Sequence, residues 1–79
     1  MNGWSSLPAD VQALAGVVLT VKQRDIWKLE LGGMSPRQIA DALGVSRSNV
    51  REHLDAAHRK LAASGVRYEQ GEWLLVEAA

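Results

Sequence analysis

The sequence has 79 residues and no cysteine, so we expect one small domain whose stability depends on neither disulfides nor thiolate metal sites. Its nine basic and nine acidic residues balance to a net charge of zero, which argues against a general polycation. No apolar run approaches the roughly 18 residues that a membrane span requires, and the N-terminus does not resemble a signal peptide. These observations predict a cytoplasmic protein without membrane contacts.

The first half of the chain carries the signals of two helices, which we expect over residues 7–18 and 21–32. Ser6 is the expected cap of the first helix, with Pro8 near its start, where the missing N–H costs nothing. Thr20 caps the second helix, and a glutamine three residues later completes a capping-box pattern. Glycines 32 and 33 should end this helix. Its apolar positions, with a tryptophan assigned to the core, are Val21, Ile26, Trp27, Leu29 and Leu31.

Two further helices, expected over residues 36–43 and 47–63, follow each other closely. Ser35 and Ser46 are their caps, and Gly44 ends the shorter helix. Apolar residues mark the seam between them, namely Ile39, Ala40, Leu43, Val45 and Val50, and the longer helix continues the stripe with Leu54, Ala57 and Leu61. Two helices joined by so short a turn cross steeply, as in a helix-turn-helix. We therefore expect an all-α domain of four helices, with residues 21–63 as its helix-turn-helix core.

In the last stretch, residues 66–77, the apolar residues no longer recur at helical spacing. Val66, Tyr68, Trp73 and Leu75 could share one face of a β-hairpin that turns at Gln70–Gly71. This register places Glu69 opposite Glu72, an unfavourable pair that a longer loop would avoid. The alternative is a short helix over residues 73–78.

Charge is polarised along the chain, and its basic part coincides with the longer helix of the motif. Residues 35–61 hold five basic and three acidic side chains, whereas one basic and three acidic side chains follow Gly65. The second helix of a helix-turn-helix enters the major groove of DNA, where arginine can pair with guanine and glutamate can accept from the cytosine amino group. The residues expected to read bases lie opposite the apolar stripe and are Arg47, Ser48, Arg51, Glu52 and Asp55.

A second set of polar residues is suited to the DNA backbone. Helix caps with free N–H groups and exposed cations bind phosphate, which assigns this role to Lys22, Arg24, Ser35, Arg37, Ser46, Asn49 and Arg59. The charges of Arg59 and Lys60 are explained equally well by an ordinary solvent-exposed helix face that does not contact DNA.

The run from Leu19 to Leu61, LTVKQRDIWKLELGGMSPRQIADALGVSRSNVREHLDAAHRKL, resembles the LuxR-type DNA-binding domain and is also similar to region four of sigma factors. His53 and the pair Lys60–Leu61 match the LuxR-type spacing, while Arg47, Arg51 and the AAHRKL stretch look more like sigma region four. The resemblance implies a bacterial or phage regulator that binds double-stranded DNA. LuxR-type domains normally continue into a dimerisation helix, and here the stretch 65–73 stands in its place.

Several functions stay open at this point. The main hypothesis is a transcriptional regulator that binds DNA, and the alternatives are a module that binds RNA polymerase or a sigma factor, or a phage packaging or recombination accessory. A homodimer or a partner protein would use Trp4, Leu74 and Val76. We expect no enzymatic activity and no cofactor. We also expect no metal site, because His53 and His58 lie five residues apart on one helix and do not share a face.

Overall fold

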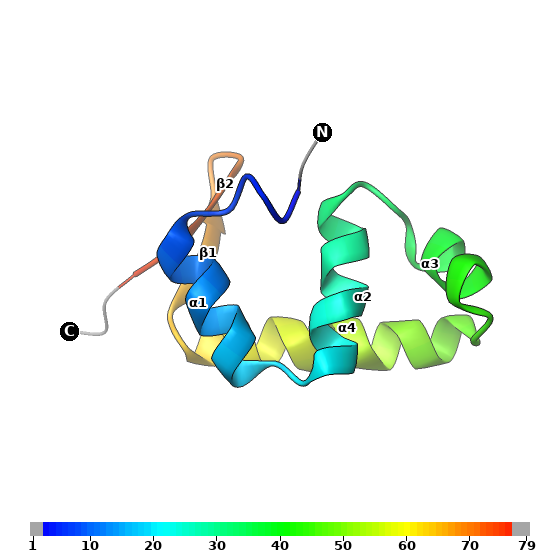
Figure 1. Cartoon of the computed structure of the whole chain (residues 1–79). Coiled ribbons are helices and arrows are strands. Elements are labelled where there is room, and N and C mark those ends of the chain that lie inside the picture. Colours follow the sequence, from blue (N-terminus) through cyan, green and yellow to red (C-terminus); the bar gives the residue numbers. More distant parts are fainter. Residues whose placement is uncertain (1–2, 77–79) are drawn as a thin grey trace.

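The computed structural model describes residues 3–76, which form four helices followed by a two-stranded antiparallel sheet. The elements are α1 (Ala9–Val18), α2 (Val21–Leu31), α3 (Pro36–Leu43), α4 (Arg47–Ala63), β1 (Val66–Glu69) and β2 (Glu72–Leu75). α4 runs along one side of the molecule and contacts the other three helices and β1 (Figure 1). α3 lies beside the N-terminal end of α4, and the hairpin lies at its C-terminal end. The expected fold is confirmed.

Local capping defines the starts of three helices as the sequence predicts. The Thr20 hydroxyl accepts a hydrogen bond from the Gln23 amide at 3.1 Å, and the Gln23 side chain accepts one from the Thr20 amide, which completes the capping box. Ser35 caps α3 with a capping box as well, and the Ser46 hydroxyl caps α4 by accepting from the Asn49 amide alone. Gly44 ends α3 in the left-handed conformation, with φ of 69°. Each contact spans only a few residues, so each is encoded locally.

The first helix begins later than predicted. α1 starts at Ala9 with Pro8 at its N-cap, and no side chain caps it, so the assignment of Ser6 as the cap was wrong. The preceding segment turns instead, because the Leu7 amide donates to the Trp4 carbonyl at 3.1 Å. The Leu7 side chain is buried in the core. Burial of Leu7 therefore fixes the path of the chain into α1.

One hydrophobic cluster joins all the elements. Its members come from the four helices, the segments that precede α1 and α2, and the hairpin. Trp27 lies at its centre, fully buried as expected, between the edges of Trp4 and Trp73, whose ring centroids lie 6.1 and 5.4 Å away. The other fully buried members are Val11, Ala15, Ile26, Ile39, Val50, Ala57 and Leu61. The predicted apolar stripe of α4 is buried along its whole length.

Two predicted core residues are exposed. Leu43 is 41% exposed, although it was assigned to the seam between α3 and α4, and Val21 is 64% exposed. Leu43 is the last residue of α3, directly before the left-handed Gly44, and this turn carries the chain away from the seam. Val21 is the first residue of α2 and lies away from the face that buries Gln23, Ile26 and Trp27.

The C-terminal segment forms the predicted hairpin. Val66 pairs with Leu75, Tyr68 with Trp73, and Glu69 with Glu72. The turn at Gln70–Gly71 has positive φ at both residues, 52° and 80°, as two-residue hairpin loops favour. The alternative of a helix from residue 73 is wrong, and its last residues, together with Glu77 at the end of the expected extension, lie outside the described residues.

Candidate nucleic-acid interface

The N-terminal turns of α4 present a polar surface that no other described element covers. Ser46 fixes the start of the helix, since its hydroxyl accepts from the Asn49 amide at 3.0 Å. On the opposite side of the helix, Val50 and Leu54 are buried. This burial sets the rotation of α4 and keeps the other face outward. The predicted base-reading residues are all exposed on that face, namely Arg47, Ser48, Arg51, Glu52 and Asp55.

Arg47 and Arg51 lie one helical turn apart and, together with Ser48, line a shallow open hollow at the surface. Among residues 3–76, the only ion pair joins His58 to Glu30, so neither arginine is held by a carboxylate of the described chain. Their guanidinium groups are therefore free to pair with an external acceptor, such as the N7 and O6 atoms of guanine.

The predicted phosphate-binding residues fall into two groups in space. Ser35, Arg37, Ser46 and Asn49 surround the N-terminal ends of α3 and α4. Lys22 and Arg24 instead flank Gln23, whose side chain accepts from the Lys60 ammonium group at 2.9 Å near the C-terminal end of α4. Because an α-helix rises 1.5 Å per residue, these two groups are separated by about 20 Å along α4. The first group thus lies beside the arginine pair, and Lys22 and Arg24 lie apart from it, so the predicted phosphate-binding residues do not form one cluster.

Arg24 and Asn49 are less accessible than the other members of this set. Each side chain is half-buried, and the Arg24 Nε and Asn49 Oδ1 atoms are enclosed without a hydrogen-bond partner. The end of the Arg24 guanidinium group lies near Gly16 of α1. Lys22 and Arg59 are exposed and unobstructed.

The structure adds two polar links that the sequence reasoning missed. Gln38 completes a second capping box, because its side chain accepts from the Ser35 amide at 2.8 Å and its amide donates to the Ser35 hydroxyl. A glutamine three residues after a serine cap was the available signal. The bond from Lys60 to Gln23 ties α4 to α2 across 37 residues, and no local pattern indicates it.

His58 and Glu30 form a second link between α4 and α2. The His58 Nε2 atom lies 2.8 Å from a Glu30 carboxylate oxygen. This hydrogen bond raises the pKa of His58 above its ordinary value, and partial burial opposes the rise without cancelling it. The pair braces α4 against α2, one helical turn beyond the predicted base-reading residue Asp55, whose charge also raises the pKa of His58. Because the Glu30 carboxylate already binds His58, we assign the pair a structural role. Within the described residues, no group of three or more His, Cys, Asp or Glu side chains could hold a metal ion.

The arrangement is that of a helix-turn-helix DNA-binding domain: a capped short helix, a left-handed glycine turn, and a capped long helix with a free polar face. The family model for bacterial regulatory proteins of the luxR family matches residues 17–67, which is more than half of the chain. The protein therefore belongs to the luxR family and is a DNA-binding regulator of transcription. Comparison with curated proteins and with solved structures gave no further match. In the part of the chain that the structure describes, no helix is long and apolar enough to cross a membrane.

Proposed function

We propose that the protein regulates transcription by sequence-specific binding to double-stranded DNA in the cytoplasm, with the N-terminal half of α4 in the major groove. One observation carries this proposal: Arg47 and Arg51 lie exposed and without ion pairs, one turn apart, on a helix whose opposite face is locked into the core. Arginine on an ordered helix can pair bidentately with guanine, while Glu52 can accept from a cytosine amino group. Ser48 and Asp55 complete the base-reading surface.

Backbone contacts would position this helix in the groove. The caps at Ser35 and Ser46, with Arg37 and Asn49, would bind phosphates on one side, and Lys22 with Arg59 on the other. The separation of about 20 Å along α4 would let the two groups contact phosphates at two separate points of the DNA backbone. Arg24 contributes less in this arrangement, because its side chain is half-buried beside α1.

The first test is alanine substitution of the two arginines. After selection of a binding site from random duplexes, Arg51→Ala should weaken specific binding by about 1–3 kcal/mol and relax the preference at one base-pair position. Arg47→Ala should relax the preference at a neighbouring base pair of the DNA site. Arg67→Ala on β1 is the control for loss of one positive charge, because the Arg67 side chain bonds the Ala62 carbonyl at the other end of α4 from the base-reading residues, so the base preference should not change. Unchanged affinity and specificity in both arginine variants, with the circular dichroism of the fold intact, would contradict groove binding.

Salt dependence provides a second test of the same proposal. About four to six phosphate contacts per copy predict a log–log slope of binding against salt of about −4 to −5. A flat response between about 50 and 200 mM salt would point to a protein partner, such as RNA polymerase or a sigma factor. The similarity of this helix to sigma region four and the acidic hairpin support that second candidate.

Two copies of the chain would read two half-sites. One helix-turn-helix domain buries roughly 600–1,000 Å² on DNA, which seldom suffices for tight selective binding alone. The supporting observation is that Val76, beside the open edge of β2, is 43% exposed, while Leu74 is half-buried. Trp4 packs against Trp27 and offers less free surface. Sedimentation equilibrium of the unsubstituted protein should show a dimer, and the variant Val76→Lys should be a monomer. If the unsubstituted protein is a monomer at high micromolar concentration, this interface is refuted.

A further inference from the structure

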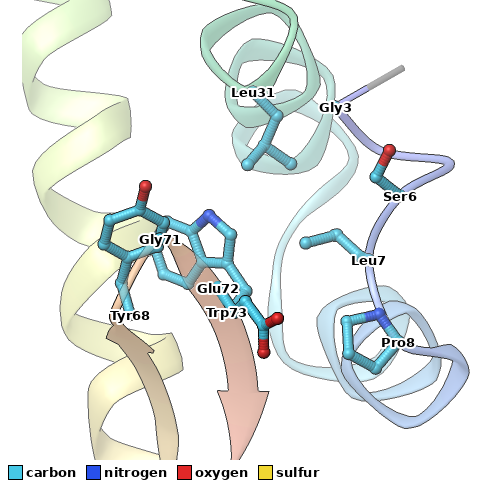
Figure 2. Close-up of a pocket in the computed structure, with 9 residues that line it drawn as sticks. All are labelled: Gly3, Ser6, Leu7, Pro8, Leu31, Tyr68, Gly71, Glu72 and Trp73. Atoms are coloured by element: carbon cyan, nitrogen blue, oxygen red, sulfur yellow. The ribbon is translucent and has the colours of Figure 1, made fainter. Parts of the chain in front are cut away.

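A hollow of about 640 Å³ lies at the end of the molecule opposite α3, between the N-terminal segment, the C-terminal end of α2 and the hairpin (Figures 1 and 2). Leu7 and Pro8 form one side of it, and Leu31 lies beside them. Tyr68 and Trp73 of the hairpin stand on the other side. Its volume lies in the range of about 300–1,000 Å³ that is typical of pockets for small organic molecules. None of its lining residues belongs to the proposed DNA surface.

The walls of this hollow are held in place by the core. Trp73 packs edge-on against the buried Trp27, and Tyr68 packs against Trp73 with ring centroids 4.9 Å apart. Leu7 is itself part of the core cluster. Gly3 packs directly against the backbone of Leu31, where a β-carbon would not fit. The hollow is therefore a built feature of the fold, with aromatic and aliphatic walls already in position.

One carboxylate, from the exposed residue Glu72, lines this hollow. Figure 2 shows the Glu72 side chain extending from the hairpin toward Leu7 and Pro8. Glu72 forms no ion pair within residues 3–76, and its cross-strand partner is Glu69, another carboxylate. Like charges directly opposite each other are unfavourable, so a cation beside Glu72 would relieve a repulsion that the hairpin retains.

The nearest cation of α2 is already engaged elsewhere. The Lys28 ammonium group lies over the Trp4 ring, 4.6 Å from its centroid, and neither residue lines the hollow. This contact also shows that an aromatic face at this end of the molecule attracts a cation. Tyr68 and Trp73 offer the same chemistry inside the hollow, next to the carboxylate.

We propose that this hollow is a binding site for a small organic amine with a flat apolar body. The ammonium group would bind the Glu72 carboxylate, and the apolar body would lie between the aromatic rings and the side chains of Leu7 and Leu31. Such a ligand matches the lining, since the hollow combines aromatic and aliphatic side chains with the Ser6 hydroxyl and one charged group that fixes orientation. An anionic ligand would meet the charges of Glu72 and Glu69, and a neutral one would form no charge-assisted hydrogen bond with the Glu72 carboxylate.

The probe is 2-phenylethylamine, compared with 2-phenylethanol and phenylacetate, which share its aromatic body and differ in charge. Binding to the full chain is followed by the indole N–H signals of the tryptophans in NMR spectra. The amine should shift the Trp73 signal saturably, with a dissociation constant of roughly millimolar or tighter for so small a ligand. The alcohol should bind about tenfold more weakly, because it lacks the charge-assisted hydrogen bond. Phenylacetate should not bind.

Two variants of the hairpin make the test specific. Glu72→Gln should weaken amine binding about tenfold, whereas Glu69→Gln should change it less than about twofold. The variants are matched, because each removes one carboxylate of the same cross-strand pair and relieves the same repulsion, while only Glu72 lines the hollow. Tyr68→Ala, at a side chain that is 60% exposed, should weaken binding several-fold without unfolding the domain.

Three results would overturn the proposal. The first is no saturable shift up to about 10 mM amine, well above the expected dissociation constant. The second is equal binding of the amine and the alcohol. The third is an equal loss of binding in Glu72→Gln and Glu69→Gln, which would show that overall acidity attracts the amine. Because no DNA is present, each of these results is independent of whether α4 binds a major groove.

Discussion

The two ends of α4 are built differently. The recognition end, residues 35–55, exposes charged side chains on helices whose starts are set by serine caps. The aromatic end, made of residues 3–8, 27–31 and 66–76, holds all three tryptophans and the hairpin. The side chains proposed to read DNA have almost no packing role, and those that form the aromatic cluster contact no proposed DNA site. This difference implies that stability and DNA binding can be changed separately by mutation.

The sharpest test of this division is removal of the central tryptophan. Trp27→Ala should lower the free energy of unfolding by about 3–5 kcal/mol, because a fully buried ring is replaced by a cavity that neighbours cannot fill. A chain of this size has a total stability of about 4–12 kcal/mol, so much of the population could unfold. Urea unfolding followed by circular dichroism measures the change. Val17→Ala, at an 82% exposed side chain, should stay within about 0.5 kcal/mol. A loss below about 1 kcal/mol for Trp27→Ala would contradict a core organised around this residue.

The junction between α4 and the hairpin gives the next largest effect. Gly65 has φ of 93°, and a β-carbon there would lie 2.5 Å from the Val76 carbonyl oxygen. Gly65→Ala should therefore cost about 2–3 kcal/mol through backbone strain and this collision. Gly71→Ala is the matched control, with φ of 80° and open space around the added carbon, and should cost only about 1 kcal/mol. Stability is measured by thermal or urea unfolding. If Gly65→Ala and Gly71→Ala lose the same unfolding free energy, the close approach of Gly65 to Val76 does not contribute to the cost.

At the recognition end, the largest stability effect should come from a cap. Ser46→Ala removes the hydrogen bond to the Asn49 amide and should cost about 1 kcal/mol of unfolding free energy. Ser48→Ala, two residues away on the exposed face, should change stability by less than about 0.5 kcal/mol. If Ser48→Ala destabilised the domain as much as Ser46→Ala, the exposed face would not be independent of the fold.

The smallest effect concerns the link between α2 and α4. The hydrogen bond to Glu30 raises the pKa of His58 in the folded state. The stability that this bond contributes is therefore fully present below the unfolded-state pKa of about 6.5 and is lost as pH rises through the raised value. Because His58 is 43% exposed and Glu30 30%, solvent screening limits this contribution to about 0.5 kcal/mol. NMR titration should show the His58 pKa falling in Glu30→Gln. An unchanged pKa in that variant would exclude Glu30 as the cause.

The sequence by itself determined the features that depend on neighbours a few residues away. The caps at Thr20, Ser35 and Ser46, the turn at Gly44 and the hairpin register all follow from hydrogen bonds or alternation within short windows. The exposure of the base-reading side chains was also predictable, because the apolar stripe of α4 defines the opposite face. The local pattern thus contained most of the fold and the candidate DNA surface.

Only the tertiary structure decided the features that join distant segments. The burial of Leu7, which delays the start of α1, and the exposure of Leu43 depend on how the elements meet. The His58–Glu30 and Lys60–Gln23 contacts span 28 and 37 residues, and the hollow takes its walls from three separate segments. The physical reason is that helix periodicity shows which face of an element is apolar. The angle at which two elements cross, and hence which polar groups come within hydrogen-bond distance, is set by the packing of side chains from the whole chain.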